Sequence, residues 1–181
     1  MRVISGAARG KKLKTPPHFD IRPTADRVKE AVFSVIHFDL PGAKVLDLFA
    51  GCGQLGIEAI SRGAVLAVMI DSAKDAAELI KENVTACGFL SNVRIAQMDA
   101  LSYIESCHEE FNVIFLDPPY DTELIDLALP KIDRILSSDG IVVCETETGK
   151  KLLEQYGKLK MHRKYKYGKV LVTTYKKEEG E

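Results

Sequence analysis

The chain has 181 residues, of which 46% are apolar, and its formal net charge is −1. This length predicts one domain with a sizeable core, and no apolar run approaches the roughly 20 residues of a membrane span. Because the four cysteines lack companion histidines and the basic N-terminus lacks a secretory apolar segment, we expect a cytoplasmic protein without disulfides, bound metal or membrane contact.

The first predicted element is a short basic β-hairpin, in which residues 2–4 pair with residues 11–14 around a glycine-containing turn. We expect residues 1–20 to form this extension and residues 21–181 to form the main domain. A helix should follow over residues 25–38, where apolar side chains recur at helical spacing.

The next element joins a strand to a helix through a glycine-rich loop that begins at Asp47. This arrangement is typical of a nucleotide-binding unit, because glycines let the backbone approach a ligand closely. Gly51, Gly53 and Gly56 satisfy the dinucleotide fingerprint. Asp71 stands twenty positions after Gly51, where a carboxylate would meet ribose hydroxyls. An NAD-dependent enzyme is therefore one candidate.

Electrostatics favours a different cofactor. Asp47 would lie near the anionic pyrophosphate of a dinucleotide, which prefers bare amides and helix N-termini. S-adenosylmethionine instead carries an ammonium and a sulfonium, and both groups would be attracted by this carboxylate. The structural alternative is that Asp47 only caps the turn after its strand.

The rest of the chain alternates strands and helices, which predicts an α/β class with a doubly wound, mostly parallel sheet. Strands are expected at residues 44–48, 65–70, 92–97, 112–117, 140–145, 158–166 and 169–175. Helices are expected at residues 54–61, 73–87, 100–107, 122–136 and 148–155. A turn at Gly168 separates the last two strands, which should form an antiparallel C-terminal hairpin.

Charge is strongly segregated along the sequence. Residues 1–30 carry a net charge of +5 and residues 150–177 carry +9, whereas residues 31–149 carry −12. If both basic ends lie on one side of the fold, they provide a footprint for nucleic acid phosphates. Two separate solvated faces are the alternative, and the tyrosines interleaved with the C-terminal lysines bring the two interpretations to equal weight.

The tetrapeptide Asp117-Pro118-Pro119-Tyr120 directly follows an apolar run that predicts a buried strand. The carboxylate of Asp117 and the carbonyl of Pro118 could accept both hydrogens of an amine, while Tyr120 covers the ring that carries it. Consecutive prolines stiffen such a loop. Taken alone, the motif is equally compatible with an ordinary strand end.

The sequence predicts that these motifs meet in space. In a doubly wound sheet, ligands bind beyond the carboxyl ends of the strands, where the strand order reverses. The strands ending at Asp47 and Asp117 would be neighbours there, so that one places the cofactor and the other the amine. Asp99, after the third core strand, could accept a hydrogen bond from an adenine amino group, and an exposed helix N-cap is its alternative role.

Together the motifs resemble those of the RsmD family of bacterial 16S rRNA guanine-N2 methyltransferases, in the class I S-adenosylmethionine-dependent superfamily. The resemblance spans nearly the whole chain and rests on Met1-Arg2-Val3-Ile4 with Arg9-Gly10-Lys11, Arg22-Pro23-Thr24 with Asp26-Arg27, Asp47-Leu48-Phe49-Ala50-Gly51, Asp117-Pro118-Pro119-Tyr120 and Tyr167-Gly168. The Asp-Pro-Pro-Tyr motif alone indicates amino-group methylation without choosing the base. The Arg-Pro-Thr segment and the short chain make the match specific to this family.

The resemblance implies roles for individual residues. S-adenosylmethionine would be bound by Asp47, Phe49, Gly51, Gly53, Asp71, Asp99 and Ala100. The target guanine would be held for in-line transfer to its N2 amine, without a metal, by Asp117, Pro118 and Tyr120. RNA would be contacted by Arg9, Lys11, Lys12, Arg22, Thr24, Arg27 and Tyr167. The implied partner is ribosomal RNA or a small-subunit assembly intermediate, and we expect a monomer.

Three other functions explain fewer of the motifs. An adenine-N6 methyltransferase acting on DNA or RNA would account for the amine-holding tetrapeptide, although the chain has no obvious target-recognition insertion. An NAD-dependent oxidoreductase would account only for the glycines and Asp71, and a non-catalytic RNA-binding module only for the basic ends.

Overall fold

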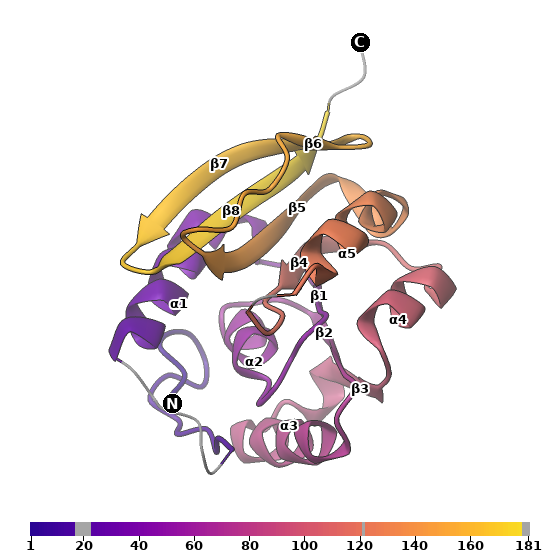
Figure 1. Cartoon of the computed structure of the whole chain (residues 1–181). Helices are drawn as coiled ribbons and strands as arrows, with labels where there is room; N and C mark the ends of the chain where they lie inside the picture. Colours follow the sequence, from indigo (N-terminus) through magenta and orange to yellow (C-terminus); the bar gives the residue numbers. More distant parts are fainter. Residues whose placement is uncertain (17–22, 121, 179–181) are drawn as a thin grey trace.

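The computed structural model describes residues 1–16, 23–120 and 122–178, which form one eight-stranded sheet flanked by helices (Figure 1). Five strands run parallel to one another: β1 (Lys44–Asp47), β2 (Leu66–Asp71), β3 (Val93–Gln97), β4 (Phe111–Leu116) and β5 (Leu136–Glu147). The sheet continues in antiparallel pairing through β6 (Gln155–Tyr156), β7 (Leu159–Tyr167) and β8 (Val170–Lys177). The strand order β3-β2-β1-β4-β5-β8-β7-β6 confirms the doubly wound, mostly parallel α/β fold.

Helices cover both faces of the sheet, and each face has its own core cluster. One cluster packs under α1 (Pro23–Val35), α2 (Gln54–Ser61) and α3 (Lys74–Cys87), and the other under α4 (Ala100–Ser106) and α5 (Leu124–Ile132). Successive strand residues alternate between the two clusters, because their side chains point to opposite faces: Phe115 joins the first and Leu116 the second. None of the described helices is long and apolar enough to cross a membrane.

The strand order reverses between β1 and β4, which are parallel neighbours. Asp47 lies beside Phe115 in their register, so Asp117 follows only two residues beyond the partner of Asp47. The two strand ends therefore meet at the same edge of the sheet, as the sequence predicts.

The C-terminal hairpin is confirmed, with β7 and β8 joined at Gly168, whose φ is +60°. The predicted helix over residues 148–155 is wrong. Gly149 weakens helix formation there, and tertiary contacts hold the segment in an extended path. Lys150 pairs with Asp126 of α5 at 2.8 Å (Nζ to Oδ2), and the Leu153 carbonyl accepts a hydrogen bond of 2.7 Å from the Tyr175 hydroxyl.

Other boundaries differ by a few residues. The expected helix over residues 122–136 is shorter: α5 ends at Ile132, and a 3₁₀ turn over Asp133–Ile135 leads directly into β5. Strand β5 is longer than the predicted 140–145 at both ends, because Leu136 pairs with Phe111 of β4 and the last residues, up to Glu147, pair with β8.

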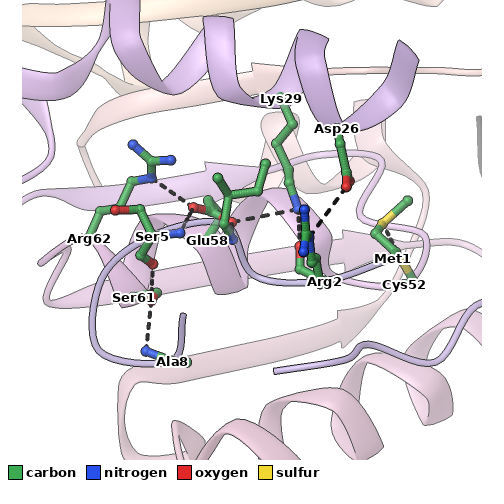
Figure 2. A network of polar contacts seen from close by, with 11 residues as sticks. Met1, Arg2, Ser5, Ala8, Asp26, Lys29, Cys52, Glu58, Ser61 and Arg62 are labelled. Carbon is green, nitrogen blue, oxygen red and sulfur yellow. Dashed lines mark hydrogen bonds and ion pairs between the residues drawn. The ribbon is translucent and has the colours of Figure 1, made fainter. Parts of the chain in front are cut away.

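The basic N-terminal hairpin forms around a single antiparallel bridge between Arg2 and Lys12. Figure 2 shows how its turn is tied to α2. Both carboxylate oxygens of Glu58 accept backbone hydrogen bonds, at 2.8 Å from Ile4 N–H and 3.0 Å from Ser5 N–H. The hairpin is therefore fixed to the helix that follows the glycine loop.

Candidate active site

A cavity of about 1110 Å³ lies at the carboxyl ends of β1 and β4, bordered by α1 and the start of α2. Nine of the ten predicted catalytic and cofactor residues line it: Asp47, Phe49, Gly51, Asp71, Asp99, Ala100, Asp117, Pro118 and Tyr120. Gly53 is the exception, because it is the N-cap residue of α2 and faces Ile80 and Met69 in the core. The topology thus brings residues from four strand ends to one cavity.

Asp47 is a buried carboxylate at the floor of this cavity, only 1% exposed. Its Oδ2 accepts a hydrogen bond of 3.3 Å from Gly56 N–H, whereas Oδ1 has no hydrogen-bond partner among the described residues. Burial raises the pKa of Asp47 to about 7, against the opposing effect of the backbone N–H groups of Gly56 and Phe49. A buried oxygen without a donor is costly, so the site favours a ligand that carries a cation or a donor.

The glycine loop leaves space beside Asp47. Gly51 has a φ of +55°, and a Cβ placed there would have nothing within 4 Å, so the backbone borders open space. The N–H of Gly51 donates to Oδ2 of Asp71 at 2.9 Å, and the N–H of Ala73 donates to Oδ1 at the same distance. Asp71 therefore holds the loop in place, and each of its oxygens retains a lone pair that could accept a further hydrogen bond.

Asp99 is the N-cap of α4, which confirms one of the two roles predicted for this residue. Its Oδ1 accepts hydrogen bonds from the Ser102 N–H at 2.9 Å and the Ser102 hydroxyl at 3.1 Å. The backbone N–H of Ser102 is the main reason why the pKa of Asp99 is lowered. The residue still lines the cavity next to Ala100, so capping and ligand contact are compatible.

All four residues of the Asp117-Pro118-Pro119-Tyr120 loop line the cavity, as do residues of the glycine loop. Asp117 is partly open to the cavity and otherwise surrounded by protein. Burial raises its pKa well above the ordinary value, and the charges of Glu145 and Asp47 raise it further. Pro118 is buried, whereas the Tyr120 side chain is 46% exposed. The loop therefore presents a half-buried ionisable acceptor and an exposed aromatic residue to the cavity.

Sequence reasoning missed four charged residues that line the cavity: Lys29 on α1, Glu145 and Glu147 on β5, and Lys169 between β7 and β8. The Tyr120 hydroxyl donates a hydrogen bond to Glu145 Oε1 at 3.3 Å. Nothing local in the sequence marks any of these four residues as part of a site. The position of Glu145 could have been found only from the register that places β5 beside β4.

Of the predicted RNA-contacting residues, the five whose side chains the structure describes do not line the cavity. Arg9, Lys11, Lys12 and Arg27 are exposed, and Tyr167 is half-buried on β7. Arg22 lies outside the described residues, as does the side chain of Thr24. Both basic ends nevertheless pack on the same face of the sheet, because Val3 and Leu13 share a core cluster with Tyr165 and Tyr167.

The carboxylates that line the cavity fit S-adenosylmethionine better than a dinucleotide. Asp47 could pair with the ammonium group, Asp71 could accept from the ribose hydroxyls, and Gly51 leaves room for the chain between them. A pyrophosphate would instead be repelled by carboxylates at Asp47, Asp71 and Asp117, which oppose the attraction of the α2 and α4 N-termini at this cavity.

Sequence comparison identifies close relatives. Residues 1–176 match the family model described as "Conserved hypothetical protein 95". The chain is 38% identical to "Putative rRNA methyltransferase YlbH" of Bacillus subtilis over 98% of this chain and 99% of the relative. It is 30% identical to "Ribosomal RNA small subunit methyltransferase D" of Escherichia coli over 98% of this chain and 90% of the relative.

Comparison of the folds agrees with these relationships. The solved structure "Putative methyltransferase yhhF from Escherichia coli" superimposes with a TM-score of 0.86 at 28% identity and covers 99% of both chains. Neither the NAD-dependent oxidoreductase nor the adenine-N6 methyltransferase is favoured by these similarities. The chain therefore belongs to the RsmD family of S-adenosylmethionine-dependent rRNA methyltransferases.

Proposed function

We propose that this protein methylates the exocyclic N2 amine of a guanine in small-subunit ribosomal RNA. The observation that carries the proposal is the meeting of Asp47 and Asp117 in one cavity, since the first suits a cationic cofactor and the second an amine. The cavity of about 1110 Å³ has room for both ligands together. We further propose that the protein acts as a monomer in the cytoplasm, on ribosomal RNA or on an assembling small subunit.

In this proposal the protein contributes mainly by positioning. S-adenosylmethionine supplies an electrophilic methyl group when bound. The amine of guanine is a poor nucleophile, because its lone pair is delocalised into the ring. Hydrogen bonds from this amine to the Asp117 carboxylate and the Pro118 carbonyl would favour a pyramidal nitrogen with its lone pair directed at the methyl. The high pKa of Asp117 also suits a group that takes up the proton released from the amine.

The target base must leave its stack before it can reach the cavity. Tyr120 stands at the rim, where its ring could cover a flipped or single-stranded guanine. Arg9, Lys11, Lys12 and Arg27 would bind phosphates around the entrance, together with Arg22, Thr24 and Tyr167. The basic N-terminal extension, predicted as residues 1–20, would thus serve as an RNA-binding arm of the catalytic domain.

Identification of the methylated nucleoside tests this function. The protein is incubated with labelled S-adenosylmethionine and either naked 16S rRNA or small subunits from cells that lack the enzyme, and the RNA is then digested to nucleosides. We expect the label in N2-methylguanosine. Label in N6-methyladenosine, or no transfer to either substrate, would refute the proposal.

A further inference from the structure

Glu145 occupies a position next to the proposed amine-binding loop. In the register of β4 with β5, Phe115 lies beside Val143, so Asp117 and Glu145 follow two residues later on neighbouring strands. Both residues line the cavity, and the charge of Glu145 raises the pKa of Asp117. The two carboxylates therefore face the same part of the cavity from adjacent strand ends.

Few hydrogen-bond donors of the protein contact these two carboxylates. Within the described part of the chain, Asp117 accepts no hydrogen bond, and Glu145 accepts one, at 3.3 Å from the Tyr120 hydroxyl. Burial raises the pKa of Glu145 as well. Two neighbouring acids that are largely removed from water are unfavourable unless a ligand supplies hydrogen-bond donors. The ligand that fits should present several donors side by side.

The Watson–Crick edge of guanine has this property, whereas that of adenine does not. Guanine presents its N1–H directly beside its N2 amine, which gives three N–H donors in a row. Adenine also carries an amine, but its neighbouring N1 is an acceptor that would face a carboxylate lone pair. A buried group that requires a donor rejects a ligand that lacks one strongly.

We propose that Glu145 accepts the N1–H of the target guanine, beside the amine held by Asp117 and Pro118, and so makes the site select guanine over adenine. This inference rests on the proposed guanine-N2 activity and assigns its base specificity to a residue outside the Asp-Pro-Pro-Tyr motif. Glu145 thus touches the substrate at a non-reacting atom, and its contribution is recognition rather than chemistry.

A purely structural role for Glu145 makes a different prediction. Glu145 also holds the Tyr120 hydroxyl, so its removal could act only by releasing the tyrosine ring. Tyr120→Phe separates the two roles, because it removes this hydrogen bond but leaves both the ring and the carboxylate in place.

The test compares guanine with 2-aminopurine, which keeps the C2 amine but has a bare acceptor at N1. The methylated position is first mapped, and reconstituted small subunits then carry either base there. The ratio of kcat/KM for the two substrates is measured for the wild type, Glu145→Gln and Tyr120→Phe. Because the amide of Gln can donate or accept, we expect Glu145→Gln to lower the preference for guanine by about tenfold or more. Tyr120→Phe should keep the wild-type ratio.

Two results would overturn the inference: an unchanged ratio in Glu145→Gln, or an equal loss of preference in Tyr120→Phe. If Glu145→Gln fails to bind the cofactor in a thermal shift assay, Glu145→Ala replaces it. Water in the vacated space can also donate or accept, so the same loss of preference is expected. Failure of the guanine-N2 activity itself would be recognised separately, because the wild type would then yield a different methylated nucleoside.

Discussion

Lys29 and Glu58 form a buried ion pair that joins α1 to α2, with 3.6 Å between Nζ and Oε2 and side chains that are 2% and 0% exposed. Figure 2 shows that the same Glu58 binds Arg62 and the turn of the N-terminal hairpin. Burial lowers the pKa of Lys29, and the attraction of Glu58 opposes this shift. Because Lys29 also lines the cavity, one polar network connects the cavity wall to the basic arm.

Glu58→Gln should therefore be strongly destabilising. The substitution leaves the Lys29 cation buried without its partner, and breaking such a pair costs about 3–5 kcal/mol of unfolding free energy. Urea denaturation measures the loss. Glu109→Gln is the matched control, since its partner Arg94 is half-exposed and the 2.6 Å pair should contribute less than about 1 kcal/mol. Equal losses in the two variants would contradict this account of the network.

Two glycines of the N-terminal hairpin allow a second matched comparison. Gly6 and Gly10 both have a φ of +83°, but a Cβ at Gly6 would lie 1.7 Å from the Ser61 carbonyl oxygen, whereas a Cβ at Gly10 would meet nothing within 4 Å. Gly10→Ala should cost about 1–2 kcal/mol from backbone strain alone. Gly6→Ala should lower the free energy of unfolding by about 1–3 kcal/mol more than Gly10→Ala, because the hairpin turn must shift away from α2 to make room for the new carbon.

Hydrogen exchange locates the effect of these two variants. In the wild type, the N–H of Ala7 donates to the Ser61 carbonyl at 2.8 Å, and the N–H of Ala8 donates to the Ser61 hydroxyl at 2.9 Å. Both amides should exchange faster in Gly6→Ala and remain protected in Gly10→Ala. Protection of both amides in Gly6→Ala would show that the turn tolerates the extra carbon.

Much of the fold followed from local signals in the sequence. Continuous apolar runs such as residues 113–116 predicted buried strands, and glycine loops predicted where strands give way to helices. The prediction of a helix over residues 148–155 was wrong because distant contacts, and not local signals, decide the structure of this segment. The Leu153 carbonyl of this segment is bound by Tyr175 and the Lys150 side chain by Asp126, and a window of neighbouring residues contains no sign of such distant partners.

The same distinction applies to the site. Asp47 and Asp117 were predictable because each stands beside a recognisable motif at the end of a strand. Glu145 has no motif, and its place beside Asp117 depends on the pairing of β4 with β5. Gly53 fits the glycine fingerprint, yet its α-carbon faces Ile80 and Met69 in the core. The fingerprint indicates the shape of the backbone, but it does not indicate which of the glycines contacts the ligand.

Asp117 is the residue on which methyl transfer should depend most. Asp117→Ala removes the acceptor proposed for the amine, so we expect the transfer rate to fall by about 100-fold or more. Cofactor affinity, measured by calorimetry, should survive largely intact. Asp117→Asn should be less impaired, because the amide oxygen can still accept one hydrogen bond. Turnover close to that of the wild type in Asp117→Ala would refute the assignment.

The buried Asp47 should make the ligand-free protein less stable as the pH rises. Its folded-state pKa is about 7 instead of the ordinary 3.8, so between these values the folded protein holds a proton that the unfolded chain has released. The free energy of unfolding should therefore fall progressively as the pH rises to about 7, by at most roughly 4 kcal/mol. Urea denaturation from pH 4 to 8 should show a shallower decline in Asp47→Asn. Parallel pH profiles for the two proteins would exclude Asp47 as the source.

The basic N-terminal arm should bind RNA in a salt-dependent manner. Arg9, Lys11 and Lys12 are exposed, and each phosphate contact that is lost should reduce the slope of log affinity against log salt by about 1. We therefore expect the triple alanine variant to bind 16S rRNA more weakly at low salt and with a flatter salt response. Lys44→Ala is the control, because this exposed lysine begins β1 at the edge of the sheet opposite the cavity. If Lys44→Ala flattened the salt response as much as the triple variant, binding would depend on overall charge rather than on this arm.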